Sequence, residues 1–208
     1  MFQNKFKNNL NACAWLWKDH SSVAEASLIT EKAKVMRPEY LTKCGGSYSS
    51  EWFWSKIWHC LNIDEEVFNS AYTWIEQSDF IPAMLAGIKN IEDLKRNICA
   101  AGHKAMYNET WGGLPDKDFL IELHPKLSEL RDSLYDKAYS FDQVLGHLSD
   151  EWSVRTGLPS GIPISVGALD AHVGAIGAGI KPGKFVKIIG TSTCDIMVFP
   201  KSKSFMDF

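Results

Sequence analysis

The sequence predicts a helix-rich α/β protein. Residues 164–166 form a short apolar run with β-branched side chains, which is typical of a buried strand. A helix of mostly small residues follows over 171–179, and residues 184–189 and 195–199 have the pattern of two hairpin strands. About four credible strands are too few for a self-sufficient doubly wound sheet, so helices are expected to form most of the fold.

The first part of the chain predicts a strand and then a helix. Residues 12–17 are apolar and predict a short strand. Ser22 and Glu25 form a capping-box pattern that opens a helix, and Pro38 marks its end at the latest. The positions expected to point inward are Val23, Ala26, Ile29 and Ala33.

Aromatic residues dominate the next segment. A Cys44-Gly-Gly turn leads to a Ser-capped helix over 51–59. Its apolar residues go most of the way round, so this helix is expected to be buried on more than one side. These residues are Trp52, Phe53, Trp54, Ile57 and Trp58. Asp64 is expected to cap the following helix, whose apolar face begins with Val67 and Phe68.

Cap signals place the remaining helices. Asn90 starts a helix with Gly102 at its C-terminal left-handed position. From Asp118 a leucine stripe predicts another helix, with Pro125 near its first turn or at a kink. Ser149 and Gly157 bracket a last short helix before the strand at 164–166.

The composition is that of an ordinary globular domain. The chain has 208 residues, of which 45% are hydrophobic and 23% charged, and its net charge of -3 gives no reason to expect nucleic acid or an acidic membrane surface as a partner. Its five cysteines are scattered without a C-x-x-C pair, which argues against a disulfide framework or a metal site and for the reducing cytoplasm. Neither a signal peptide nor a membrane span is predicted.

Two groups of residues could carry chemistry near the end of the chain. Asp170 lies where the strand has ended and a helix begins, a place where α/β folds bind ligands, but aspartate is also a favoured helix cap. Spacing alone leaves both interpretations open. The hairpin turn contains Gly190, Thr191, Ser192 and Thr193, whose amides and hydroxyls could bind phosphate. Hydroxyl-rich turns are also common in hairpins that bind no ligand.

Several ordered motifs resemble the FGGY family of carbohydrate kinases. The resemblance runs from about Asn11 to the last strand. Within the family it is closest to the members that phosphorylate ribulose. The motifs are Leu16-Trp-Lys-Asp-His20, Gly45-Gly46, Tyr48-Ser-Ser-Glu-Trp-Phe-Trp54, Ala101-Gly-His-Lys-Ala-Met106, Thr156-Gly-Leu-Pro159, Gly167-Ala-Leu-Asp-Ala-His172 and Gly190-Thr-Ser-Thr-Cys194.

The resemblance implies a partial ribonuclease-H-like, or actin-like ATPase, fold. Residues 1–182 would be part of the N-terminal sugar-binding lobe, and residues 183–208 would begin the C-terminal nucleotide-binding lobe with its first hairpin. The family's Asp-x-Gly-Thr hairpin, which holds the metal, and its adenine-binding lobe have no counterpart in this sequence. The isolated chain is therefore expected to be inactive, and to associate through uncovered strand edges and apolar patches.

The resemblance also assigns roles to individual residues. Asp170 would be the general base that takes the proton of the attacking sugar hydroxyl, and Lys104 would hydrogen-bond the sugar. The turn at 190–193 would bind phosphate of ATP, with Mg²⁺ as cofactor in the complete enzyme. Trp17 would pack against the carbon face of the sugar, although a core role is equally open. The pathway implied is arabinose catabolism.

Other residues are weaker candidates. Asp19 and His20 follow Trp17 and could contact substrate or only cap the next helix. His172 follows Asp170, and a partly buried structural histidine is the favoured interpretation. Asp195 stands where the family usually has histidine, and a carboxylate there would repel phosphate unless it faces away. A kinase of another pentulose or polyol, and a non-catalytic scaffold built from a truncated lobe, remain alternatives.

Overall fold

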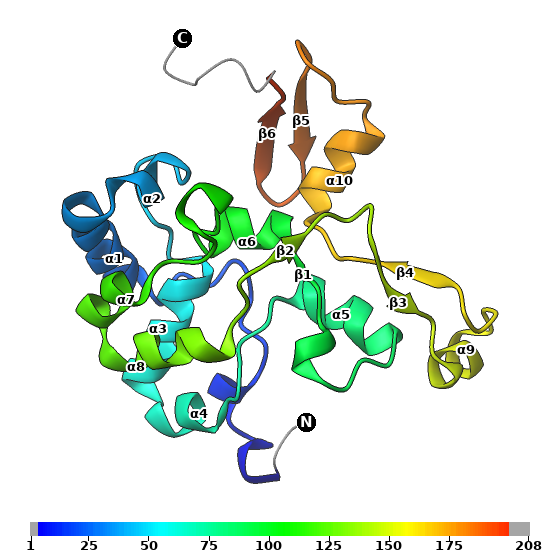
Figure 1. The fold of residues 1–208 in the computed structure, drawn as a ribbon, viewed down its shortest axis with the longest axis horizontal. Helices are drawn as coiled ribbons and strands as arrows, with labels where there is room; N and C mark the ends of the chain where they lie inside the picture. The colour runs from blue at the N-terminus through cyan, green and yellow to red at the C-terminus, as the bar shows by residue number, and fades with distance from the viewer. Residues whose placement is uncertain (1–3, 200–208) are drawn as a thin grey trace. The chain divides into compact units, whose positions relative to one another are not determined.

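The computed structural model describes residues 4–199 and divides after Gly167 into two compact units (Figure 1). Helix α10 and the hairpin of β5 and β6 lie in the second unit, and the other helices and strands lie in the first. The boundary between lobes expected at residues 182 and 183 concerns the family's whole fold and stays a prediction.

Helices make up most of the first unit, as predicted. Its α-helices are α1 (Val23–Met36), α2 (Pro38–Thr42), α3 (Phe53–Ile63), α4 (Glu65–Ser70), α5 (Gln77–Leu85), α6 (Ile98–Lys104), α7 (Lys117–Leu123), α8 (Pro125–Leu130) and α9 (Asp150–Thr156). Short 3-10 helices span Asn4–Phe6, Leu10–Ala12, Ile91–Asp93, Glu109–Trp111 and Arg131–Ser133.

The strands of this unit are short and form two separate pairs. Strand β1 (Arg96–Asn97) lies parallel to β2 (Ala138–Tyr139). Strand β3 (Val144–His147) lies antiparallel to β4 (Pro163–Ser165), with an irregularity between Val144 and Gly146. Among the described residues no helix is both long and apolar enough to cross a membrane.

The main core of the first unit surrounds α3. The aromatic helix is buried on several sides, as predicted, and Trp54 and Ile57 are almost inaccessible to solvent. The core cluster also draws residues from α1, α7 and α8, including Ile29, Phe119, Leu120 and Leu127. A second, smaller cluster joins α5 to the β3–β4 pair through Ala83, Leu145 and Val166.

Local cap signals predicted two helices well. Ser149 and Gly157 flank α9, and Gly157 has the left-handed φ of 74° that favours glycine at this position. Asp64 precedes α4, and its Oδ1 accepts a hydrogen bond from the Val67 amide at 3.1 Å. The left-handed Gly157 and the Asp64 cap bond are local features that the sequence pattern could predict, whereas the Ser149 side chain makes no cap bond.

The capping box predicted at Ser22 is wrong, although α1 itself is present. The Ser22 hydroxyl donates to the Ser50 carbonyl at 2.7 Å, and the Glu25 carboxylate accepts from the Asn62 amide at 2.9 Å. Both side chains are used for contacts between distant segments instead of capping their own helix. Val23, expected to point inward, is 55% exposed. Trp52, which makes no side-chain cap bond, precedes α3 in place of the expected serine cap.

Three other local predictions need correction. Residues 12–17 form no strand: Ala12 ends a 3-10 helix, Trp17 lies in a turn, and no pairing with a strand is found in the described part of the chain. The helix expected from Asn90 is broken into a 3-10 turn, β1 and α6, and Gly102 lies inside α6. Pro125 begins a separate helix, α8, where its missing amide costs no hydrogen bond.

Glycine at position 167 permits a very close approach of two chain segments. A Cβ atom there would lie 1.8 Å from the carbonyl oxygen of Ser78, at the start of α5. The strand that precedes it is only partly buried: Val166 is 1% exposed, whereas Pro163 and Ser165 are exposed. The prediction of a strand here is confirmed, but its burial is limited to one end.

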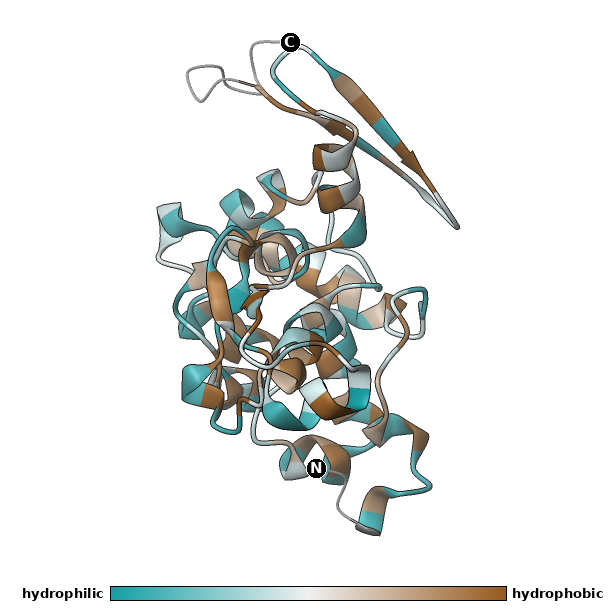
Figure 2. Cartoon of the chain, turned by 90° about the vertical axis from the view of Figure 1, so that its right-hand side faces the viewer, coloured by the Kyte–Doolittle hydropathy of each residue, from teal (hydrophilic) through white to brown (hydrophobic). Residues whose placement is uncertain are grey.

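The second unit consists of α10 (Asp170–Gly177) and a hairpin of β5 (Phe185–Ile189) and β6 (Thr193–Met197). Its strands are antiparallel, with Lys187 opposite Asp195. Gly174 of α10 packs against Ile188, since a Cβ there would lie 3.3 Å from the Ile188 Cδ1. Figure 2 shows brown hydrophobic segments along both strands of the hairpin, where Phe185 and Ile189 are exposed.

Candidate functional site

Residues 48–56, the turn before α3 and its first turn, support the end of α6. We call this stretch the 48–56 segment. The Tyr48 hydroxyl donates to the Lys104 carbonyl and accepts from the Trp54 amide at 3.0 Å. The indole of Trp54 donates to the Ala105 carbonyl at 3.0 Å. Burial raises the pKa of Tyr48 well above its usual value, so its hydroxyl remains a donor.

The C-terminal end of α6 is therefore satisfied by aromatic side chains. Met106 adopts the left-handed conformation there, with φ of 55°, in place of the glycine that the sequence predicted at 102. The Trp111 indole donates to the Met106 carbonyl at 3.0 Å. Three successive carbonyls, which a helix end leaves unpaired, thus each accept from a side chain of another segment.

The same 48–56 segment also holds the turn that carries Trp17. The Lys56 ammonium donates to the Leu16 carbonyl. His20, at the other end of the turn, is hydrogen-bonded through Nδ1 to the Ser50 hydroxyl at 2.9 Å, and its Nε2 lies 3.4 Å from the Glu51 carboxylate. Trp17 itself is 41% exposed, so part of its ring remains available for contact.

Lys104 is paired with a carboxylate in this structure. Its Nζ lies 3.2 Å from Oε2 of Glu76, the residue that precedes α5, and both side chains are mostly buried. Burial lowers the pKa of Lys56. The negative charges of Asp19 and Glu76 oppose this shift, and the positive charge of Lys104 adds to it. The turn at 16–20 and the end of α6 are therefore electrostatically connected through Lys56.

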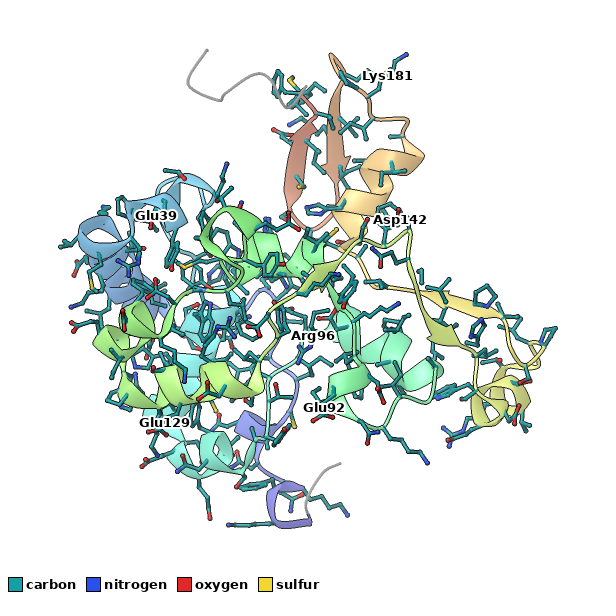
Figure 3. All side chains as sticks on the ribbon, in the orientation of Figure 1. Glu39, Glu92, Arg96, Glu129, Asp142 and Lys181 are labelled. Carbon is teal, nitrogen blue, oxygen red and sulfur yellow. The ribbon has the colours of Figure 1, made fainter. Side chains whose placement is uncertain are left out.

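A buried polar network fixes the other end of α6. The Asn97 side chain accepts from the Ala100 amide at 2.7 Å and caps the helix, while its Nδ2 donates to Asp79 Oδ1 at 2.6 Å. Arg96, which Figure 3 labels in the middle of this unit, is 3% exposed and lies 3.9 Å from Asp79. Burial raises the pKa of Asp79 to about 6 even though Asn97 and Arg96 oppose the shift.

The two weaker candidates beside Trp17 make different kinds of contact, one local and one with a distant segment. Asp19 Oδ1 accepts from the Ser21 hydroxyl and the Ser21 amide, and these bonds lower its pKa. These bonds do not cap α1, which begins at Val23 with Ser22 at its cap position, and a substrate role for Asp19 stays a prediction. His20 instead joins the turn to the 48–56 segment, as described above.

In the second unit, Asp170 is the first residue of α10 rather than its cap. Leu169 holds the cap position without a side-chain bond, and Asp170 Oδ1 accepts from the adjacent Ala171 amide at 2.8 Å. The carboxylate is exposed, with room for further hydrogen bonds. Partial burial lowers the pKa of His172, and the charge of Asp170 opposes that shift.

The turn at 190–192 joins two strands of equal length. The Gly190 amide donates to the Ser192 carbonyl at 2.9 Å, so this amide is engaged within the turn, while Thr191, Ser192 and Thr193 are exposed. Asp195 forms an ion pair with Lys187 across the hairpin at 2.8 Å. The lysine offsets the negative charge of Asp195 near the turn at 190–193. Within residues 4–199 no group of three or more His, Cys, Asp or Glu side chains could hold a metal ion.

Two residues of the first unit were not among the sequence candidates. Lys56 lies in the aromatic run of α3, where attention goes to core packing, although a lysine among buried aromatics is itself an unusual pattern. Glu76 gives no local signal, because its partner Lys104 is 28 residues away. Their roles follow from contacts between distant segments.

The fold is that of carbohydrate kinases. The structure matches the xylulose kinase of Rhodospirillum rubrum with a TM-score of 0.65 and 24% identity, over 86% of this chain and 35% of that chain. It matches the xylulose kinase of Bifidobacterium adolescentis with a TM-score of 0.70 and 15% identity, over 88% of this chain and 42% of that one. The predicted partial, helix-rich actin-like lobe is confirmed at the level of the fold.

Among carbohydrate kinases, the chain is similar in sequence to ribulokinases. The chain is 47% identical to the ribulokinase of Vibrio parahaemolyticus over 195 residues, which are 93% of this chain and 34% of that protein. It is 37% identical to the ribulokinase of Shouchella clausii over 185 residues, 88% of this chain and 32% of that protein. Over these residues, the chain is similar to ribulokinases.

The chain spans about a third of the length of the curated relatives it matches. No protein-family model matches it.

Proposed function

We propose that the complete protein is an ATP-dependent kinase that phosphorylates ribulose to ribulose 5-phosphate. The observation that carries this proposal is the 48–56 segment, which binds both the turn of Trp17 and the end of α6 that carries Lys104. Both contain motifs that resemble those of the ribulose-phosphorylating kinases. A segment that fixes an exposed indole and a lysine in one unit suits a sugar, which offers a carbon face and several hydroxyl groups.

In the proposed reaction Asp170 acts as the general base. The sugar hydroxyl oxygen attacks the γ-phosphorus of ATP, the bond from that phosphorus to the bridging oxygen breaks to release ADP, and Asp170 accepts the hydroxyl proton. Its exposed carboxylate, held only by the neighbouring amide, supports this role because it retains accepting capacity. Positioning and charge stabilisation supply most of the catalysis in such transfers.

The hydroxyl-bearing turn is proposed to contact phosphate of ATP. Thr191, Ser192 and Thr193 are exposed and can donate from their side chains. Mg²⁺ is the cofactor expected for this chemistry, but the described residues do not form a site for it, and no step is derived through the metal. Activity is accordingly proposed for the complete protein and not for the 208-residue chain alone.

We place this reaction in the cytoplasm, as a step of arabinose catabolism. The five cysteines are scattered and include no C-x-x-C pair, which supports a reducing compartment.

A sugar panel tests the proposed function. The complete protein, with Mg-ATP and each of ribulose, xylulose, other pentuloses and polyols, should release ADP fastest with ribulose, at a kcat/KM at least about tenfold above the next sugar. Preference for xylulose or a polyol would replace ribulose within the same class. Absence of ADP release with every sugar, in protein that melts cooperatively, would contradict the kinase proposal.

A further inference from the structure

Lys56 is buried without a role in the proposed chemistry. It lies on α3 among core aromatic residues and is 9% exposed. Burying a lysine ammonium is costly unless partners replace its water. Trp54, Ile57 and Trp58 of the same helix are buried, and an apolar residue at position 56 would serve packing equally well. The retained charge must therefore be explained by what the ammonium contacts.

The ammonium is hydrogen-bonded to the backbone just before Trp17. Lys56 Nζ donates to the Leu16 carbonyl, a charge-assisted hydrogen bond between segments 40 residues apart. The chain then turns through Trp17 to His20, which is bound to Ser50. Both ends of the turn are thus hydrogen-bonded to residues of the 48–56 segment, and the bond from Lys56 is the one nearest to Trp17 in the chain.

The electrostatic surroundings keep the ammonium in place. Asp19 and Glu76 favour its charged form, and the nearby Lys104 disfavours it. Glu76 also forms an ion pair with Lys104, so the same carboxylate favours the charged form of Lys56 and pairs with Lys104. Lys56 therefore lies where the Trp17 turn and the Lys104 ion pair meet.

We propose that Lys56 is a positioning residue for sugar recognition, which holds the Trp17 turn against α3 so that the exposed indole is fixed before the sugar binds. This inference rests on the proposed function, because the ligand of Trp17 is taken to be the sugar. Lys56 acts through the Leu16 carbonyl and does not itself contact substrate. Its loss should loosen the turn and weaken sugar binding while the chemical step remains intact.

The test compares Lys56→Met with wild type in the complete protein. Methionine fills a similar volume and removes the donor, and replacing a buried charge with an apolar side chain is often tolerated. Lys32→Met is the matched control, since Lys32 forms a more exposed ion pair with Glu122. The readouts are KM for ribulose, KM for ATP, kcat, and hydrogen exchange of the amides at 17–21 by mass spectrometry.

For Lys56→Met we expect KM for ribulose to rise about tenfold, with kcat and KM for ATP within about twofold of wild type. Amide exchange at 17–21 should accelerate several-fold, while α1 and the later turns of α3 keep their protection. Lys32→Met should change none of these quantities. A purely structural role would lower melting temperature and alter all kinetic constants together, and that result would overturn the inference.

The inference and the proposed function fail in different ways. Unchanged exchange at 17–21 or unchanged KM for ribulose, in an active Lys56→Met protein, would overturn the inference alone. A wild-type protein that phosphorylates no sugar would overturn the proposed function, and the sugar role of Lys56 with it.

Discussion

The 48–56 segment and the β5–β6 hairpin use polar groups in opposite ways. In the first, Tyr48 and Trp54 are buried and hydrogen-bond to carbonyls about 50 residues away. In the hairpin, Lys187 and Asp195 are about half exposed and pair across adjacent strands. Buried bonds between distant segments fix geometry, and leaving one partner unpaired costs stability. Exposed groups contribute little to stability and remain available for ligands.

The difference predicts which substitutions alter folding and which alter chemistry. Removing the Tyr48 hydroxyl from the 48–56 segment should reduce stability, because it leaves two buried backbone groups without a partner. Changes at exposed carboxylates and hydroxyls of the second unit should leave stability unaltered and reduce turnover. The three predictions that follow test this separation, in order of decreasing effect.

Asp170→Asn should lower kcat with ribulose by on the order of 10²–10⁴, the usual contribution of a general base. Melting temperature should remain within about 1 °C, because the exposed carboxylate accepts only a neighbouring amide and sits at a helix start where its charge is worth only tenths of a kcal/mol. Steady-state ADP release and thermal unfolding measure the two effects.

Asp118→Asn is the matched control for Asp170, since Asp118 is also an exposed aspartate in the first turn of a helix. It should retain wild-type turnover. A kcat of Asp170→Asn equal to that of this control would remove Asp170 from catalysis.

Tyr48→Phe should destabilise the protein by about 2–4 kcal/mol, because it leaves the Lys104 carbonyl and the Trp54 amide without a buried partner. The ring itself, and its packing, are preserved. Chemical denaturation monitored by tryptophan fluorescence measures the loss. Tyr72→Phe provides the control, because Tyr72 is 69% exposed and its substitution should be nearly neutral.

If Tyr48→Phe were as stable as Tyr72→Phe, the 48–56 segment would not hold the end of α6 by hydrogen bonding. The distinction between the two regions would then lose its main support.

Asp79→Asn should change how stability depends on pH. The folded pKa of Asp79, about 6, is above the unfolded value of 3.8, so the folded state binds the proton more tightly between these values. Its contribution is therefore fully present below about pH 4 and is lost as pH rises through 6. Between pH 4 and 6 the stability of wild type relative to Asp79→Asn should fall by about 1 kcal/mol per pH unit.

Thermal or denaturant unfolding of both proteins across pH 4–7 provides this comparison. A difference in stability that is constant over the range, or that grows with pH, would contradict the raised pKa of Asp79.

Local signals account for the parts of the fold that the sequence predicted. Gly157 and Asp64 act within one helical turn, and α9 ends and α4 begins where these two residues require it. Helix α5 was missed, because Pro82 lies inside it and interrupts the pattern. The predicted strand at 12–17 failed because an apolar run becomes a strand only when another strand pairs with it, and Ala12 here ends a 3-10 helix instead.

The candidate site shows the same limit. Lys104 and Trp17 could be named from motifs, and their roles remain predictions. Lys56 and Glu76 could not be identified, because their functions depend on the Leu16 carbonyl and on Lys104, which are distant in sequence. The hydrogen bonds from Tyr48 and Trp54 to distant backbone carbonyls likewise leave no periodic pattern in the sequence from which they could be predicted.

The central claim is that the first unit recognises the sugar through groups held by the 48–56 segment. Calorimetric titration of the complete protein with ribulose and, separately, with ATP tests it in wild type and Lys104→Met. Loss of the ammonium should weaken ribulose binding about 10- to 100-fold, corresponding to about 1–3 kcal/mol, and leave ATP binding unchanged. Equal weakening for both ligands, or unchanged affinity for ribulose, would contradict the claim.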